Sequence, residues 1–246
     1  MIPVAGALLA LAGIALDTQT APRFYRLLLV IALVATGISG FVTASKFSRG
    51  DRLLKSWLFI GLGYALSAVR HGTRLIGYYE PAIVLPPTLS SALVIAQNIA
   101  IALALLLFVL AWRATGLTAP VSRRAQITST FLGIAVAVIV GGFPLVKALT
   151  SAEPNPVLLI STAGDIVGLS LIVPLALSAL AMRGGLLMHT WIYLAASEVA
   201  WLLYDVWWAL QPPVASNVST AILEAMRLLA VLFAFIATVA QRRAMR

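Results

Sequence analysis

Long apolar segments separated by short polar breaks occupy most of this 246-residue chain. Nearly all of them reach the roughly 20 residues that an α-helix needs to cross a bilayer. Since a backbone surrounded by lipid must satisfy its own hydrogen bonds, such segments predict an all-α, polytopic integral membrane bundle. The first segment is short enough to be interfacial or partly inserted, which leaves seven or eight spanning helices open. We place the segments at residues 2–17, 23–45, 52–76, 90–113, 126–149, 157–182, 187–210 and 218–241.

The composition excludes a soluble protein with a large core. Hydrophobic residues make up 61% of the chain and charged residues 10%, whereas soluble domains average about 45–50% and about 25%. The net charge of +9 does not indicate a nucleic-acid partner, because the basic residues lie in short loops between apolar runs. No long polar linker interrupts the segments, so we interpret residues 1–246 as one membrane domain.

The residue types give little support to cofactor chemistry. The chain has no cysteine and two histidines, so the sequence offers no thiolate metal site and no repeated histidine pair for a haem or a di-iron centre. It also offers no nucleophile–base pair and no phosphate-binding motif. We therefore expect no cofactor, no metal and no enzymatic activity.

The basic residues predict an orientation in the membrane. Loops rich in lysine and arginine stay on the cytoplasmic side, and one side of the predicted bundle holds most of them, including the C-terminus. We therefore expect a cytoplasmic C-terminus in a plasma or inner membrane. Aromatic side chains are expected at both membrane interfaces. The outer set is Tyr78, Tyr79, Trp207 and Trp208, and the inner set is Trp57, Trp112 and Trp191.

An internal repeat divides the predicted helices into two units. Arg49-Gly50 and Trp57 recur as Arg183-Gly184 and Trp191, at the same spacing and each between two apolar segments. A shift of 134 residues superimposes the second helix on the sixth and the third on the seventh. The units cover 23–113 and 157–241, and a single helix at 126–149 links them so that both keep the same orientation. Duplicated membrane bundles place their working site where the copies meet.

The second unit carries a pattern known from membrane carriers. Its leading helix contains Pro174, the basic turn Arg183-Gly184 follows, and the next helix bears a polar residue before an aromatic run over 197–204. This pattern resembles the PQ-loop and SWEET families of small-solute carriers, over about 23–241. Gly40 matches Pro174 in the repeat, and both residue types loosen a helix. The resemblance therefore implies a carrier in which Gly40 and Pro174 are hinges.

Two positions depart from these families. Leu175 stands where glutamine is usual, and Glu198 stands where asparagine is common. Microbial rhodopsins have a related seven-helix layout, but the last helix here has no lysine to form a Schiff base with retinal. We therefore expect no bound retinal.

Ionisable residues inside the apolar segments mark the candidate site. Each costs roughly 2.5–3.5 kcal/mol on insertion scales and so needs an explanation. In the second unit, Glu198 lies close to the predicted midplane, and Asp205 and Trp201 share its helical face. Asp165 lies within the preceding helix. The last helix carries Glu224 and Arg227 in its outer half.

The first unit offers a different polar set. Ser67, His71 and Arg74 share one helical face, with Arg70 adjacent to it. Gln97 and Asn98 open the next helix, and Gln97 matches Glu224 in the repeat. Cations and amides thus stand in one unit, and mostly acids in the other. If the units face each other, these complementary sets meet in the outer half of the bundle.

Structural explanations remain open for each group. Glu224 and Arg227 are three residues apart and can neutralise each other along one helix. Arg70, His71, Arg74 and Asp205 can snorkel to the outer interface. Asp165 and Glu198 can be hydrogen-bonded structural acids. Gly37, Ser39 and Gly40 are explained by close helix packing through small residues.

Two function classes follow. The first is a small-solute or proton-coupled carrier, in which Glu198, with Asp165 and Asp205, binds a proton or a cationic group. It requires Asp165, Glu198 and Glu224 to converge on one cavity between the units. The second is a membrane sensor or accessory subunit that acts through a partner protein, a lipid or a pigment. The partners expected are the lipid bilayer, a small solute or proton, and a second copy or another membrane protein.

Overall fold

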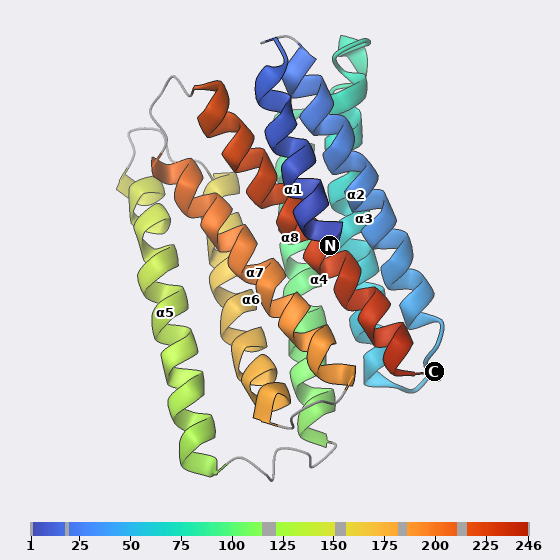
Figure 1. Cartoon of the computed structure of the whole chain (residues 1–246), viewed down its shortest axis with the longest axis vertical. Helices are drawn as coiled ribbons and strands as arrows, with labels where there is room; N and C mark the ends of the chain where they lie inside the picture. Colours follow the sequence, from blue (N-terminus) through green and yellow to red (C-terminus); the bar gives the residue numbers. More distant parts are fainter. Residues whose placement is uncertain are drawn as a thin grey trace.

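The computed structural model describes residues 2–17, 20–114, 122–150, 156–181, 186–210 and 216–245. These residues form eight α-helices, two 3-10 turns and no strands, so the predicted all-α class is confirmed (Figure 1). The helices are α1 (Ile2–Ala12), α2 (Thr20–Ala44), α3 (Arg52–Ile76), α4 (Pro87–Ala114), α5 (Arg123–Thr150), α6 (Pro156–Ala181), α7 (Leu186–Leu210) and α8 (Asn217–Ala244). The 3-10 turns are η1 (Gly13–Ala15) and η2 (Pro81–Ile83).

Four helical segments of the described chain are long and apolar enough to cross a membrane. They are α2, α4, residues Thr130–Thr150 of α5, and α8. These segments are compatible with a membrane protein. We call the end at which α2, α4, α6 and α8 begin the upper end, as it lies in Figure 1, and the opposite end the lower end.

Helix α1 does not cross the bundle. It has 11 residues, about 16 Å at the rise of an α-helix, and the N-terminus lies at half the height of the bundle (Figure 1). From there α1 packs against α8 and reaches the upper end. The chain then turns through η1, where Gly13 lies against the ring of Tyr25 and has no room for a side chain. The helix expected over 2–17 is therefore only a half-length one.

Six helices pack side by side in a closed ring. Each contacts its neighbours in the order α2, α3, α4, α6, α7, α8, and α8 closes the ring onto α2. Helix α5 lies outside the ring, at one edge of the molecule in Figure 1, and packs against α6 and α7. The contacts within the ring repeat in the same order in its two halves. The pair α2–α3 corresponds to α6–α7, α3–α4 to α7–α8, and α4–α6 to α8–α2.

The turn between α2 and α3 is short and capped. Asp51 precedes α3, and its carboxylate accepts a hydrogen bond of 2.8 Å from the backbone N–H of Leu53. An acid at this position satisfies a free N–H group and favours the positive end of the helix. The corresponding turn of the predicted repeat, Arg183-Gly184-Gly185, lies outside the described residues.

Small and hydroxyl-bearing residues join α2 to its two neighbours. On the α3 side, a Cβ on Gly40 would come within 2.8 Å of the backbone nitrogen of Gly61. On the α8 side, Thr43 donates to the carbonyl of Thr238 at 3.3 Å. Arg242 donates to the Ser39 carbonyl at 2.9 Å. Gly40 thus permits close packing of α2 against α3.

Neither predicted hinge interrupts its helix in this structure. Helix α2 continues through Gly40, and α6 continues through Pro174.

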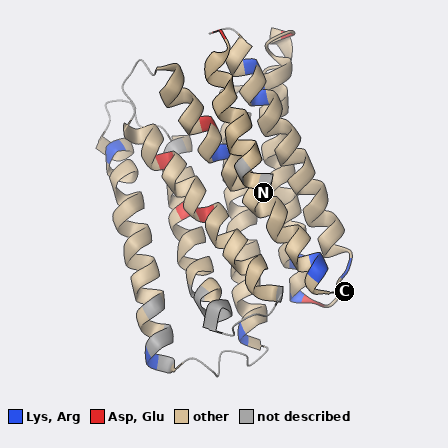
Figure 2. Ribbon diagram, in the orientation of Figure 1, with Lys and Arg blue, Asp and Glu red and all other residues tan. Residues whose placement is uncertain are grey.

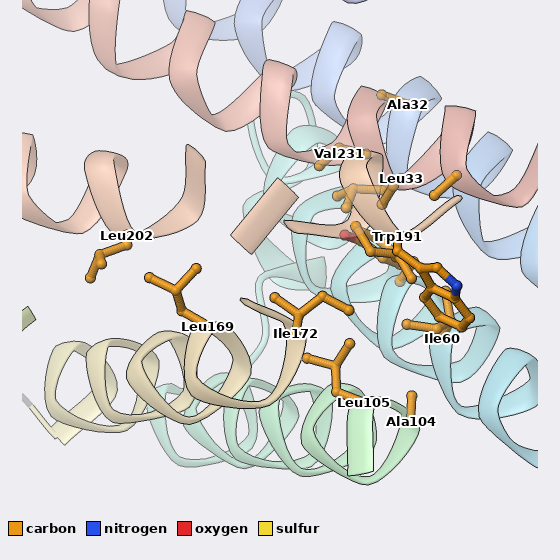
Figure 3. Close-up of a cluster of buried hydrophobic side chains, with 14 of the residues drawn as sticks. Ala32, Leu33, Ile60, Ala104, Leu105, Leu169, Ile172, Trp191, Leu202 and Val231 are labelled. Carbon is orange, nitrogen blue, oxygen red and sulfur yellow. The ribbon is translucent and has the colours of Figure 1, made fainter. Parts of the chain in front are cut away.

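Aromatic rings fill the core near the lower end. The ring of Phe108 lies between Trp57 and Trp191, with centroids at 5.0 and 5.1 Å in edge-to-face geometry. Trp112 lies 6.2 Å from Trp191. We call these four residues the aromatic plug. The plug continues into a core to which α2, α3, α4, α6, α7 and α8 all contribute (Figure 3).

The plug corrects the prediction of an inner aromatic belt. Trp57, Trp112 and Trp191 expose only 0%, 6% and 3% of their surface, respectively. Their rings pack on Phe108 and on one another instead of facing a membrane interface, because edge-to-face contacts and burial of large apolar surfaces favour the interior. Of the predicted outer set, Tyr78, Tyr79 and Trp208 are exposed and Trp207 is partly buried, and the outer belt stays a prediction.

Candidate functional site

A cavity of about 790 Å³ occupies the upper half of the ring. It is lined by α3, α4, α6, α7 and α8, together with Arg26 of α2. The aromatic plug lies beyond its lower side. The structure brings all ten ligand or proton-binding candidates of the sequence to this one cavity, from both predicted units. They are Arg70, His71, Gln97, Asn98, Asp165, Glu198, Trp201, Asp205, Glu224 and Arg227.

The same face of α3 and of α7 lines the cavity. On α3 this face comprises Tyr64, Ser67, Arg70, His71 and Arg74, and on α7 it comprises Glu198, Trp201, Tyr204, Asp205 and Trp208. Each residue of one helix is 134 residues from its counterpart on the other. The spacing is shared but the chemistry differs: the basic Arg70, His71 and Arg74 of α3 match residues of α7 that are acidic or aromatic.

A similar correspondence holds between α4 and α8, with a shift of 126 residues. It pairs Asn98 with Glu224, one residue away from the pairing of Gln97 with Glu224 expected from the sequence. The lining residues are Val94, Gln97, Asn98 and Ile101 on α4, and Thr220, Leu223, Glu224 and Arg227 on α8.

Three carboxyl groups form an acidic wall on α6 and α7. Asp165, Glu198 and Asp205 are 7%, 6% and 2% exposed, respectively. Asp205 accepts a hydrogen bond of 3.0 Å from the hydroxyl of Thr162, and all three acids line the cavity. Ionised carboxylates gathered in one buried region repel one another, and a shared proton or a bound cation would relieve that repulsion.

Glycines of α6 make room for this wall. A Cβ on Gly168 would overlap the carboxylate of Glu198, and one on Gly164 would overlap the amide of Asn98. One oxygen of Asp165, Oδ2, is buried without a hydrogen-bond partner among the described residues. A buried polar atom of this kind is costly unless something binds it. Figure 2 shows acidic residues in the region where α6, α7 and α8 lie.

Arginines and a histidine form a basic wall on α2 and α3. Arg26 donates to Nδ1 of His71 at 2.7 Å. Arg70 and Arg74 both donate to the hydroxyl of Ser90, at 3.1 and 3.3 Å. These contacts connect α2, α3 and α4 along one side of the cavity.

Arg227 lies between the two walls on α8. Its guanidinium forms an ion pair with Glu224 at 3.2 Å, donates to the hydroxyl of Tyr204, and lies 4.6 Å from the centre of the Tyr204 ring. The neutralisation of Glu224 by Arg227 along one helix, which the sequence left open, is therefore present. Both residues line the cavity nevertheless.

Two of the residues for which snorkelling was open are buried. His71 is 6% exposed and Asp205 is 2% exposed, and both are held by hydrogen bonds inside the bundle. A snorkelling side chain places its polar tip in water. Snorkelling therefore does not describe these two positions.

A hydrogen-bonded chain crosses the lower side of the cavity. The hydroxyl of Ser197 donates to the Ala230 carbonyl at 2.8 Å, so its oxygen is left to accept from Tyr64, 3.3 Å away. Tyr64, Ser197 and Ala230 belong to α3, α7 and α8, respectively. This chain joins helices of the two predicted units.

The sequence interpretation missed Arg26. It counts this residue only among the basic residues of the outer side and does not name it as a site candidate, whereas Arg26 is the seventh residue of α2 and lines the cavity. The signal was available, because an ionisable residue inside an apolar segment marks a functional candidate. For metals, the described residues contain no group of three or more histidine or carboxylate side chains that could hold an ion.

No protein-family model, no curated protein and no solved structure matches this chain. The resemblance to PQ-loop and SWEET carriers therefore stays a prediction.

Proposed function

We propose that this chain is an integral membrane carrier for a small polar solute, coupled to a proton or a cation. The observation that carries the proposal is the convergence of charged and polar residues from α2, α3, α4, α6, α7 and α8 on one cavity. Asp165, Glu198 and Glu224 are among them, as a carrier with its site between two units requires. A cavity of about 790 Å³ also has the size of a small-molecule site.

Seven membrane-spanning helices, α2 to α8, are part of the proposal. Each has 25 to 28 residues, about 38 to 42 Å along the helix axis. Helices α2 to α4 form the first unit, α5 the link, and α6 to α8 the second. The exchangeable ring contacts and the matching faces of α3 and α7 support this duplication.

The lower end is proposed to be cytoplasmic. It carries basic residues of the α2–α3 turn and the C-terminal arginines, among them Arg49, Arg52, Arg242 and Arg243 (Figure 2). Loops and termini with this excess stay inside the cell. In this orientation the cavity lies in the outer half of the membrane, and the aromatic plug separates it from the cytoplasm.

The carrier mechanism uses the two walls in different ways. The carboxyls of Asp165, Glu198 and Asp205 take up a proton or a cation, which relieves the repulsion between them. Solute enters from the upper end, and rearrangement of one unit against the other opens the lower side. Gly40 and Pro174 are the proposed positions at which α2 and α6 bend.

Glu198→Gln tests this mechanism. The variant keeps the size of the side chain but removes its ability to bind a proton, so we expect proton-coupled flux to fall about tenfold or more. Purified protein is reconstituted into vesicles that contain a pH-sensitive dye, and proton movement is followed when a panel of small amines, carboxylates and sugars is added.

The matched control is Glu80→Gln, since Glu80 is exposed and lies outside the cavity. It is expected to behave like the parent protein. Full solute-driven proton flux in a folded Glu198→Gln protein would contradict the mechanism.

The alternative is a sensor or accessory subunit, and helix α5 is the observation that favours it. This helix lies outside the ring and exposes large apolar side chains, including Phe131 at 72% and Ile139 at 74%. Such a face fits lipid or a partner membrane helix. A partner that co-purifies in equal amount, together with no flux by the isolated chain, would support this alternative.

A further inference from the structure

We propose that Arg26, Arg70 and Arg74 form a binding site for an oxyanion, a carboxylate or a phosphate group, on the α2–α3 side of the cavity. The inference deepens the proposed function and rests on it, because it gives the chemical class of one end of the solute. The observation behind it is the basic wall, to which the proposed uptake of a proton or a cation assigns no role.

Positive charge accumulates on this wall without a neutralising partner. Among the described residues, the one ion pair joins Arg227 to Glu224. No described carboxylate therefore lies within 4.0 Å of Arg26, Arg70 or Arg74. The charges of Arg26, Arg74 and Arg227 all act on Arg70. Like charges held close together repel one another, and a bound anion would relieve that repulsion.

Most of the N–H groups of these arginines have no acceptor in the described protein. Each guanidinium carries five N–H donors in a planar fork. Arg26 uses one on His71, at 2.7 Å, and Arg70 and Arg74 each use one on the hydroxyl of Ser90. All three side chains line the cavity, so the remaining donors are available to a group within it.

The wall is also preorganised. A hydroxyl oxygen has two lone pairs, so Ser90 accepts from both Arg70 and Arg74 and holds the two forks beside each other. Nδ1 of the buried His71 fixes Arg26 in the same way. Planar forks held in place match the paired oxygens of carboxylate and phosphate, and their fixed positions lower the entropic cost of binding.

The opposite wall directs an anion to this side. Asp165, Glu198 and Asp205 stand on α6 and α7, where their carboxyl oxygens repel an oxyanion. A solute with an anionic group is therefore expected to place that group on α2 and α3, and to turn its neutral or cationic part toward α6 and α7. Trp201 and Tyr204 lie in edge-to-face contact at 5.9 Å and line the cavity beside that second part.

The experiment is equilibrium binding to the purified full chain in an uncharged detergent. Inorganic phosphate and acetate are titrated by calorimetry at constant ionic strength, set with sodium chloride. We expect saturable binding of at least one of the two anions. In the double variant Arg70→Gln/Arg74→Gln the affinity should fall about tenfold or more, because charge-assisted paired hydrogen bonds are lost.

Arg23→Gln is the matched control. Arg23 lies on the same helix as Arg26, but it is exposed, rests over the rings of Tyr78 and Tyr79 at 5.9 and 5.5 Å, and does not line the cavity. Its affinity for phosphate and acetate should equal that of the parent protein. If the double variant does not fold, the single variant Arg74→Gln, at an exposed position, is used in its place.

A second arm identifies the source of the oxyanion. The protein is reconstituted in vesicles of phosphatidylcholine with and without phosphatidylglycerol, and phosphate and acetate binding is repeated. Binding in both supports a soluble solute. Binding of phosphatidylglycerol that depends on Arg70 and Arg74, with no soluble anion bound, supports the oxyanion site and assigns it to a lipid headgroup.

Besides the absence of all anion binding, two results would overturn the inference. One is a heat signal that chloride reproduces at equal ionic strength, and the other is unchanged binding in the folded arginine variants. If neither anion nor phosphatidylglycerol binds while Glu198-dependent flux is intact, the anion site is wrong and the proposed carrier stands. Anion binding without any flux would instead count against the carrier.

Discussion

At the scale of single residues, the site depends on side chains that are absent as much as on those present. Gly168 lies against Glu198, and Gly164 lies against Asn98, in both cases with no room for a Cβ. Both glycines are one helical turn or less from Asp165. These two glycines of α6 therefore leave the space that the side chains of Glu198 on α7 and Asn98 on α4 occupy.

Gly168→Ala tests this dependence. The new methyl group would overlap the Glu198 carboxylate, which is the end of a flexible side chain and must turn away to make room. We expect reduced proton-coupled flux with little change in the unfolding temperature in detergent. Gly142→Ala in α5 is the control, because a Cβ there meets nothing within 4 Å and alanine favours a helix. Unchanged flux in Gly168→Ala would show that Glu198 moves aside without consequence.

At the scale of helices, α2 and α3 come into backbone contact where they cross at Gly40 and Gly61. The atoms that a Cβ on Gly40 would meet, at 2.8 and 2.9 Å, belong to the backbone of Gly61. A backbone cannot rotate away as a flexible side chain does. Small residues in this position let membrane helices approach closely.

Gly40→Ala separates the packing role of this residue from the hinge role. If packing governs, the helices must move apart, and we expect a loss of about 1–3 kcal/mol in the free energy of unfolding. Thermal unfolding followed by circular dichroism in detergent measures it, with Gly142→Ala again as the control. A variant with parent stability but altered solute flux would favour the hinge.

The sequence predicted helices well and their buried faces poorly. Apolar runs predicted seven long helices to within a few residues, and ionisable residues inside those runs identified cavity residues in both predicted units. It did not predict that Trp57 is fully buried while the adjacent Leu58 is 41% exposed. In a membrane bundle the lipid-facing and core-facing sides are both apolar, so hydrophobicity alone does not distinguish them. Charged residues are distinguishable, because lipid excludes them.

At the scale of the whole molecule, the absence of cysteine from the sequence gives a direct test of orientation. Ser48→Cys places a thiol in the exposed turn at the lower end, and Thr88→Cys places one in the exposed start of α4 at the upper end. We expect a membrane-impermeant maleimide added to intact cells to label Thr88→Cys alone. Ser48→Cys should react only after the cells are opened. The reverse pattern would invert the proposed topology.

The aromatic plug gives the molecule a built-in optical reporter. Three of the six tryptophans in the chain, Trp57, Trp112 and Trp191, lie in it, and Trp57 and Trp191 occupy matching positions in the two predicted units. Indole emission depends on the polarity around the ring, and these three rings are buried in this structure. In the proposed carrier, opening of the lower side would bring water to them, so intrinsic fluorescence would follow that opening without an attached dye.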